Sequence, residues 1–356
     1  MFSTAIALML ATMLTTAPLQ SSAAPQTPPN PKSPANPKSA PNPTSPPNAK
    51  SPANPVAGAP ERAALLQQAA TAQKSGRTDE AIRLYRLAAE RHQSVQAYIE
   101  LARLQSRTGD AASALTSLNK ARDLAPNSED VLSAMAQVAL AAKRPMPAVL
   151  TLQSLTRICP TVAQYHYLLG VGLMAVGDMP AADDALKEAN RLEPEKPLTL
   201  IALGLVLNNR KQFDEARSAL IRSVELQPDS IEAMAALAEA HAGLRAFDRA
   251  TVVARRVLER SPSNGTANLV MGMILMEQKD YAGARDALLK ATAADPDSPK
   301  AFYQLSLAAA RLGDEAAAKR YVQVYQEKLQ AVEDRVNELR AGGSLKPGPQ
   351  PPRKPR

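Results

Sequence analysis

Two successive 34-residue stretches with a common pattern decide the fold of this chain. Residues 163–196 read AQYHYLLGVGLMAVGDMPAADDALKEANRLEPEK, and residues 197–230 read PLTLIALGLVLNNRKQFDEARSALIRSVELQPDS. Aligned, they share a glycine at position 8, an alanine at position 20, a leucine at position 24 and a proline at position 32. Self-similarity at a fixed period of this length is the signature of a repeat protein.

The same pattern extends in both directions along the chain. Six prolines are each separated by 34 residues, namely Pro126, Pro160, Pro194, Pro228, Pro262 and Pro296. With each proline at position 32, residues 62–332 divide into eight units that start at residues 62, 95, 129, 163, 197, 231, 265 and 299. Position 20 is alanine in every unit: Ala81, Ala114, Ala148, Ala182, Ala216, Ala250, Ala284 and Ala318.

Each unit predicts two antiparallel helices. Apolar residues at positions 4, 7, 8 and 11 fall on one face of a first helix, and small residues at positions 8 and 20 let the two backbones approach closely. The first helix is expected to end at Gly76, Gly109, Gly177 or Gly313 in four units. The unit at 129 carries Lys143-Arg144-Pro145 there, so we expect its turn to differ. Aspartates at positions 16 or 18 are expected to cap the second helix: Asp79, Asp110, Asp178, Asp214, Asp248, Asp280 and Asp314.

This arrangement closely resembles the tetratricopeptide repeat family over roughly three quarters of the chain. The resemblance implies an all-α fold, a right-handed superhelical solenoid of about eight repeats. It also implies that positions 2, 5, 9, 12 and 13 of the first helices face a concave groove in which partner proteins bind. The paired Lys and Asn that some relatives use to bind a C-terminal carboxylate are absent, because Leu66 and Ala70 stand at those positions.

The groove positions are apolar in several units, and we predict that they form a protein-binding surface. The alternative left open is that superhelical packing buries them against neighbouring helices. The predicted groove residues are Tyr167, Val171, Met174, Ile201, Leu205, Asn208, Leu269, Met273, Met276, Tyr303 and Leu307.

The last repeat is followed by a longer helical pattern, from Glu315 to about Arg340. Its apolar residues recur at intervals of three and four: Tyr325, Leu329, Val332, Val336 and Leu339. The pattern favours a capping helix that covers the final apolar face of the solenoid. A dimerising helix is the alternative.

The first 60 residues are of a different kind. The apolar run AIALMLATML at 5–14, followed by small residues, predicts a signal peptide at 1–24 and export to a periplasmic or extracellular location. Residues 25–60 contain 13 prolines and predict a disordered spacer before a repeat domain at 61–341. Residues 342–356 form a basic, proline-rich tail.

The net charge of +8 lies mostly at the two ends of the chain. Residues 1–60 carry +3 and residues 342–356 carry +4, so the repeat domain is left with +1. A clustered basic face is therefore not expected on the domain, and with few aromatic residues we predict no nucleic-acid partner. The basic ends leave open weak contact with an acidic envelope polymer or a membrane surface.

The sequence contains no recognisable catalytic motif. Its three histidines, His92, His166 and His241, do not form a ligand pattern, and Cys159 is alone. We therefore predict no enzyme activity, no cofactor and no metal. The favoured function is an exported protein-interaction scaffold or adaptor. The alternatives are a structural envelope component tethered through its ends, and a regulatory subunit of a complex whose catalysis lies in another chain.

Overall fold

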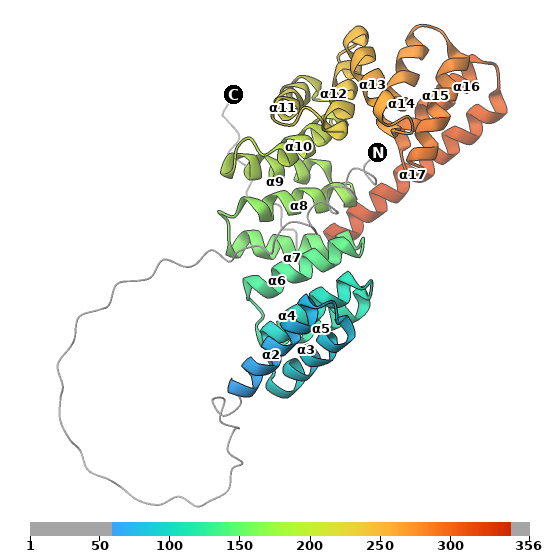
Figure 1. Ribbon diagram of the computed structural model, residues 1–356. Helices are drawn as coiled ribbons and strands as arrows, with labels where there is room; N and C mark the ends of the chain where they lie inside the picture. Colours follow the sequence, from blue (N-terminus) through green and yellow to red (C-terminus); the bar gives the residue numbers. More distant parts are fainter. Residues whose placement is uncertain (1–58, 343–356) are drawn as a thin grey trace, which may run out of the picture.

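The computed structural model describes residues 59–342, which form 16 consecutive helices and no strand. The helices alternate as the repeats predict, and successive pairs stack into a curved solenoid (Figure 1). The first helices of the units are α2 (Ala59–Lys74), α4 (Val95–Arg107), α6 (Glu129–Ala141), α8 (Ala163–Val176), α10 (Pro197–Asn209), α12 (Ile231–Gly243), α14 (Gly265–Glu277) and α16 (Pro299–Arg311). The second helices are α3 (Thr78–His92), α5 (Ala111–Leu124), α7 (Pro145–Ile158), α9 (Met179–Leu192), α11 (Phe213–Leu226), α13 (Phe247–Arg260), α15 (Tyr281–Ala294) and α17 (Glu315–Gly342).

Small residues at position 8 set the distance between the two helices of a unit. A Cβ placed on Gly204 would lie only 2.4 Å from Cγ of Leu220, the residue at position 24 of the same unit. Gly170 and Gly272 meet the equivalent leucines in the same way. The alanines at position 20 are fully buried in seven units, and only the one in the last unit is partly exposed. The close approach expected from the sequence is therefore confirmed.

The turns inside the units share one conformation. The four glycines expected there have positive φ, and so do Lys143, Lys211, Arg245 and Lys279 at the same position of four other units. The expectation that the turn at Lys143 differs is wrong, because Lys143 adopts φ 54° and α7 begins at Pro145, in a register shared with the other units. Proline is tolerated in a first turn, where its missing N–H is not needed.

The capping predictions are confirmed at position 16 and wrong at position 18. Aspartates at position 16 accept backbone N–H groups of their second helices: Asp110, Asp178, Asp280 and Asp314. Asp79, Asp214 and Asp248 instead lie inside the first turn, and the residues before their helices make no side-chain cap. Their carboxylates still lie at the positive end of the helix dipole.

Helix α17 is twice as long as the other second helices and leaves the last repeat. Its first part packs on α16, and its far end reaches α8, four repeats back along the solenoid (Figure 1). Leu339, near its C-terminal end, is fully buried in the core formed by the middle repeats. The helix therefore closes the concave side of the second half of the solenoid, in addition to capping α16.

The helical region begins slightly earlier than the domain boundary taken from the sequence. Helix α2 starts at Ala59, so it includes Pro60 from the end of the predicted spacer. The predicted signal peptide, most of the spacer and the predicted tail after Gly342 lie outside the described residues. Between residues 59 and 342 no helix has the length and apolar composition needed to cross a bilayer.

Candidate functional site

A large groove lies between the concave face of the last six repeats and α17. Its volume is about 1640 Å³, above the ~300–1,000 Å³ typical of small-molecule pockets. The walls come from the C-terminal end of α6, from α8, α10, α12, α14 and α16, from the turns that follow these helices, and from α17. A space of this size and length suits a segment of polypeptide.

Seven of the eleven predicted groove residues line this space: Met174, Leu205, Asn208, Met273, Met276, Tyr303 and Leu307. They come from four helices, α8, α10, α14 and α16, that are far apart in the sequence. Helix α17 adds two residues of its apolar seam, Leu329 and Val332, from the opposite side. The superhelix and the C-terminal helix together thus bring apolar side chains to one concave surface.

The other four predicted residues do not reach the groove. Tyr167, Val171, Ile201 and Leu269 are buried in the hydrophobic core and do not line the space, so the packing alternative holds for them. Met174, Leu205 and Asn208 line the space but are also no more than 9% exposed. Of the four that do not line it, Tyr167, Ile201 and Leu269 occupy position 5, which packs against the following repeat. Leu269, for example, clusters with Leu305 of the next unit. Tyr303 is also at position 5 but has no repeat after it, and it stays 44% exposed.

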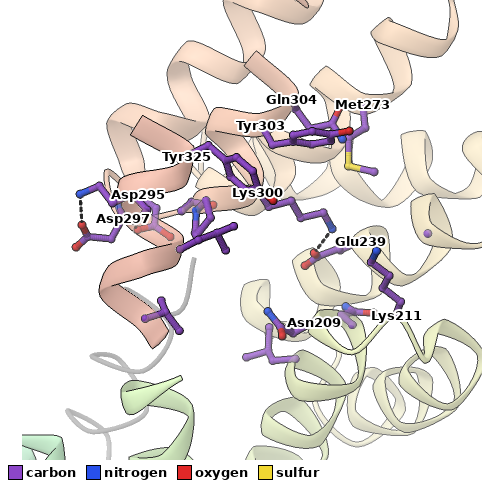
Figure 2. A pocket seen from close by; sticks show the side chains of 18 of the residues that line it. Asn209, Lys211, Glu239, Met273, Asp295, Asp297, Lys300, Tyr303, Gln304 and Tyr325 are labelled. Atoms are coloured by element: carbon purple, nitrogen blue, oxygen red, sulfur yellow. Dashed lines mark hydrogen bonds and ion pairs between the residues drawn. The ribbon is translucent and has the colours of Figure 1, made fainter. Parts of the chain in front are cut away.

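Aromatic and aliphatic side chains gather at the C-terminal end of the groove. The rings of Tyr303 on α16 and Tyr325 on α17 are 5.4 Å apart between centroids, and Met273 extends toward the same region from α14 (Figure 2). Leu307, one turn further along α16, is 37% exposed. Exposed apolar groups that converge in a concavity mark a binding surface.

A partly buried ion pair on the groove wall was not predicted from the sequence. Glu239 occupies position 9 of the unit at 231, and Lys300 on α16 donates to its Oε1 at 2.6 Å, across 61 residues of chain (Figure 2). The Glu239 side chain is only 6% exposed. Position 9 is apolar in the neighbouring units, and positions 5 and 12 of this unit are Ala235 and Ala242. A single carboxylate among these apolar positions is the sequence feature that could have predicted a charged partner.

Further charges line the rim of the groove. Lys328 on α17 donates to Oδ1 of Asp297 at 2.7 Å, and this hydrogen bond lowers the pKa of the Asp297 carboxyl. Arg245 pairs with Glu277 across neighbouring turns. The first contact joins α17 to the turn before α16, and the second joins the turn after α12 to the end of α14.

One polar group on the groove wall lacks a partner. The Asn208 side chain is 3% exposed, and its Nδ2 donates to the carbonyl oxygen of Ala236 at 2.8 Å. Within the described chain its Oδ1 accepts no hydrogen bond. This oxygen has almost no solvent-accessible surface, so a ligand in the groove does not reach it in this arrangement of the Asn208 side chain.

Helix α17 is fixed at its far end by the turn between α8 and α9. A Cβ placed on Gly177 would lie 2.6 Å from Cγ1 of Val332, so glycine is needed for the two backbones to meet. Arg335 Nε donates to the Val176 carbonyl at 3.4 Å, and Arg340 Nη2 lies 3.3 Å from Oδ2 of Asp178. This contact bounds the groove at the far end of α17.

The comparisons with known proteins agree with this architecture. A sequence model of the family described as the cilia and flagella-associated protein 70 C-terminal domain, whose label marks it as tetratricopeptide repeats, matches residues 62–301. The chain belongs to this tetratricopeptide repeat family. No curated protein matches the sequence.

Solved tetratricopeptide repeat structures show the same fold at low sequence identity. A tetratricopeptide repeat protein from Parabacteroides merdae is 15% identical, with a TM-score of 0.54, over 70% of this chain and 99% of its own. The APC/C hetero-tetramer Cut9–Hcn1 gives 17% identity and a TM-score of 0.51, over 67% of this chain and 48% of its own. At these identities the likeness extends to the fold alone.

The described tetratricopeptide repeats contain no cluster of three or more His, Cys, Asp or Glu side chains that could hold a metal ion. His241 is buried, and burial lowers the pKa of its imidazole, with Arg249 and Arg217 adding to the shift. It lies on α12 but does not line the groove. The chemistry that the groove offers is therefore apolar contact, hydrogen bonding and charge.

Proposed function

We propose that this protein is a non-catalytic interaction scaffold that binds a segment of a partner protein between its repeats and α17. The observation that carries the proposal is the groove itself, with exposed Tyr303 and Leu307 and partly exposed Met273 and Met276 on its wall. Methionine is unbranched and adapts to varied partners, which suits a binding surface. Membership of a family that binds proteins in this groove supports the same conclusion.

We also propose that the scaffold is exported. The apolar run at 5–14 with small residues after it supports a cleaved signal peptide, and the proline-rich stretch that follows would separate the repeats from any surface near the N-terminus. The second candidate function is an envelope component held through its basic ends, which the concentration of positive charge at those ends favours.

Replacing one groove methionine by a charge tests the proposal. Met273→Glu is expected to reduce the amount of crosslinked partner recovered from the native host at least tenfold, because anchors of this size stabilise a complex by ~1–3 kcal/mol each. Helix content measured by circular dichroism should stay unchanged, since Met273 is partly exposed on the groove wall.

The matched control places the same charge outside the groove. Val252 on α13 is 70% exposed, so Val252→Glu should leave the recovered partner unchanged. If the same amount of partner is recovered with both variants, the groove is not the binding site. Unfolding of Met273→Glu would show that Met273 belongs to the core instead of the binding surface.

A further inference from the structure

The charge of the repeat domain is unevenly distributed. Eight basic and four acidic side chains line the groove, which gives it a net charge of +4. Residues 61–341 as a whole carry only +1, so the surface outside the groove carries −3. The groove is thus a basic surface, although the repeat domain as a whole is almost neutral.

Four of the basic residues stand at the same position of four repeats. Lys143, Lys211, Arg245 and Lys279 occupy position 15, at the turn after the first helix, and all line the groove. Their φ values lie between 54° and 64°, a conformation that glycine adopts at lower cost and does adopt at this position in the other four repeats. Each departure from glycine here introduces a cation, which points to a role beyond the turn.

Three of these four cations have no acidic partner within the described chain. Arg245 is held by Glu277, whereas no carboxylate within residues 59–342 forms an ion pair with Lys143, Lys211 or Lys279. Lys211 and Lys279 are the two that flank the repeats nearest Met273. Lys211 extends into the space beside the Glu239–Lys300 pair (Figure 2). Neighbouring first helices pack at ~8–10 Å, so two lysines two repeats apart are separated by roughly 16–20 Å.

We propose that the groove binds an extended, acidic protein segment whose carboxylates pair with Lys211 and Lys279. This inference rests on the proposed scaffold function and specifies its partner chemistry. An extended chain rises about 3.3 Å per residue, so acidic residues five or six positions apart would reach both lysines. The apolar residues between them would lie against Met273 and Met276 on the groove wall.

Charge also excludes the chain's own ends as occupants. Residues 1–60 carry three lysines and no acidic residue, and residues 342–356 carry four basic residues and no acidic one. Either segment would bring positive charge to a groove that already carries +4. The complementary occupant is therefore an acidic segment of another protein.

Two synthetic peptides test this inference by fluorescence anisotropy with the full chain. The probe is fluorescein-labelled DLMDLMD, whose terminal aspartates are six positions apart, and its neutral match is NLMNLMN. We expect the acidic peptide to bind at least tenfold more tightly than the amide peptide, and the difference to shrink as NaCl rises. The double variant Lys211→Gly/Lys279→Gly should bind the acidic peptide no better than the amide peptide.

Glycine is the replacement because it suits the positive φ of both turns. The midpoint of thermal unfolding of the double variant should therefore equal or exceed that of the parent protein, which separates lost binding from lost folding. The control, Lys290→Gln/Lys319→Gln, removes the same charge from exposed sites outside the groove and should bind both peptides like the parent.

Several results would overturn the inference. Equal binding of the two peptides would leave an apolar groove without acidic selectivity, so the scaffold function would stand while the partner chemistry failed. If the control variant loses as much affinity for the acidic peptide as the double glycine variant, the peptide is attracted by the overall charge and does not pair with the two lysines. If neither peptide binds, the assignment of an acidic segment fails. The crosslinking experiment with Met273→Glu then tests the scaffold function by itself. Tighter binding of a single-stranded DNA oligonucleotide would assign the cations to a nucleic acid instead.

Discussion

Ala216 represents the alanine that occupies position 20 of every repeat. It is fully buried and belongs to the core shared by the middle repeats. The two helices of its unit approach so closely that a Cβ on Gly204, at position 8, would lie 2.4 Å from Cγ of Leu220. A larger side chain at the fully buried position 20 would therefore push the helices apart.

We predict that Ala216→Leu lowers the free energy of unfolding by ~1–3 kcal/mol, because extra methylenes in a packed interior force the helices apart. Chemical denaturation monitored by circular dichroism measures the loss. Ser218→Leu, on the exposed face of the same helix, should change stability by less than about 0.5 kcal/mol. An unchanged midpoint for Ala216→Leu would contradict the close-approach argument.

The groove residues show which features of a single residue the sequence could predict. The family resemblance placed positions 5, 9 and 12 of the first helices on the concave side. Met273 and Met276, at positions 9 and 12 of the unit at 265, line the groove, whereas Val171, at position 9 of the unit at 163, is buried in the core. The placement failed at position 5, where burial of Ile201 depends on the next repeat and exposure of Tyr303 depends on there being none. That difference arises from stacking between units, which the pattern within one unit does not contain.

Helix α17 is the element that turns an open solenoid into an enclosed groove. Its apolar seam was visible in the sequence, and both a cap and a dimerising helix were consistent with it. The structure places the seam against the protein's own repeats, with Val332 at Gly177 and Leu339 fully buried. The contacts of Arg335 and Arg340 span 159 and 162 residues, so their partners could not be found without the curvature of the superhelix.

We predict that Leu339→Asp detaches the C-terminal half of α17 from the repeats. A carboxylate cannot be buried without a partner in this core, and loss of a buried leucine costs about 2–5 kcal/mol. Hydrogen exchange followed by mass spectrometry should show faster exchange in 329–342 while α8 to α16 stay protected. Glu338→Ala, at an exposed neighbouring position, is the control. Simultaneous loss of protection throughout the repeats would show that α17 is an integral part of the folding unit.

At the scale of the whole molecule, positive charge is concentrated in the groove and at both ends of the sequence. Residues 1–60 and 342–356 carry +3 and +4, the groove lining +4, and the remaining surface of the repeat domain −3. An acidic partner would therefore be attracted both to the groove and to the chain segments that flank the repeats. Net charge alone concealed this distribution, because opposite charges within the domain nearly cancel.

The final prediction concerns where this molecule works. We predict that expression of the full chain in a bacterial host yields exported protein whose N-terminus lies near residue 24 or 25, because an apolar run of ten residues followed by small residues is recognised and cleaved as a signal peptide. Cell fractionation and N-terminal sequencing measure both outcomes. The variant Leu8→Arg interrupts the apolar run and should leave the uncleaved chain in the cytosol, while Lys38→Gln, in the proline-rich stretch, should be exported like the parent. Recovery of the parent chain from the cytosol with Met1 intact would contradict export and move the search for an acidic partner to the cell interior.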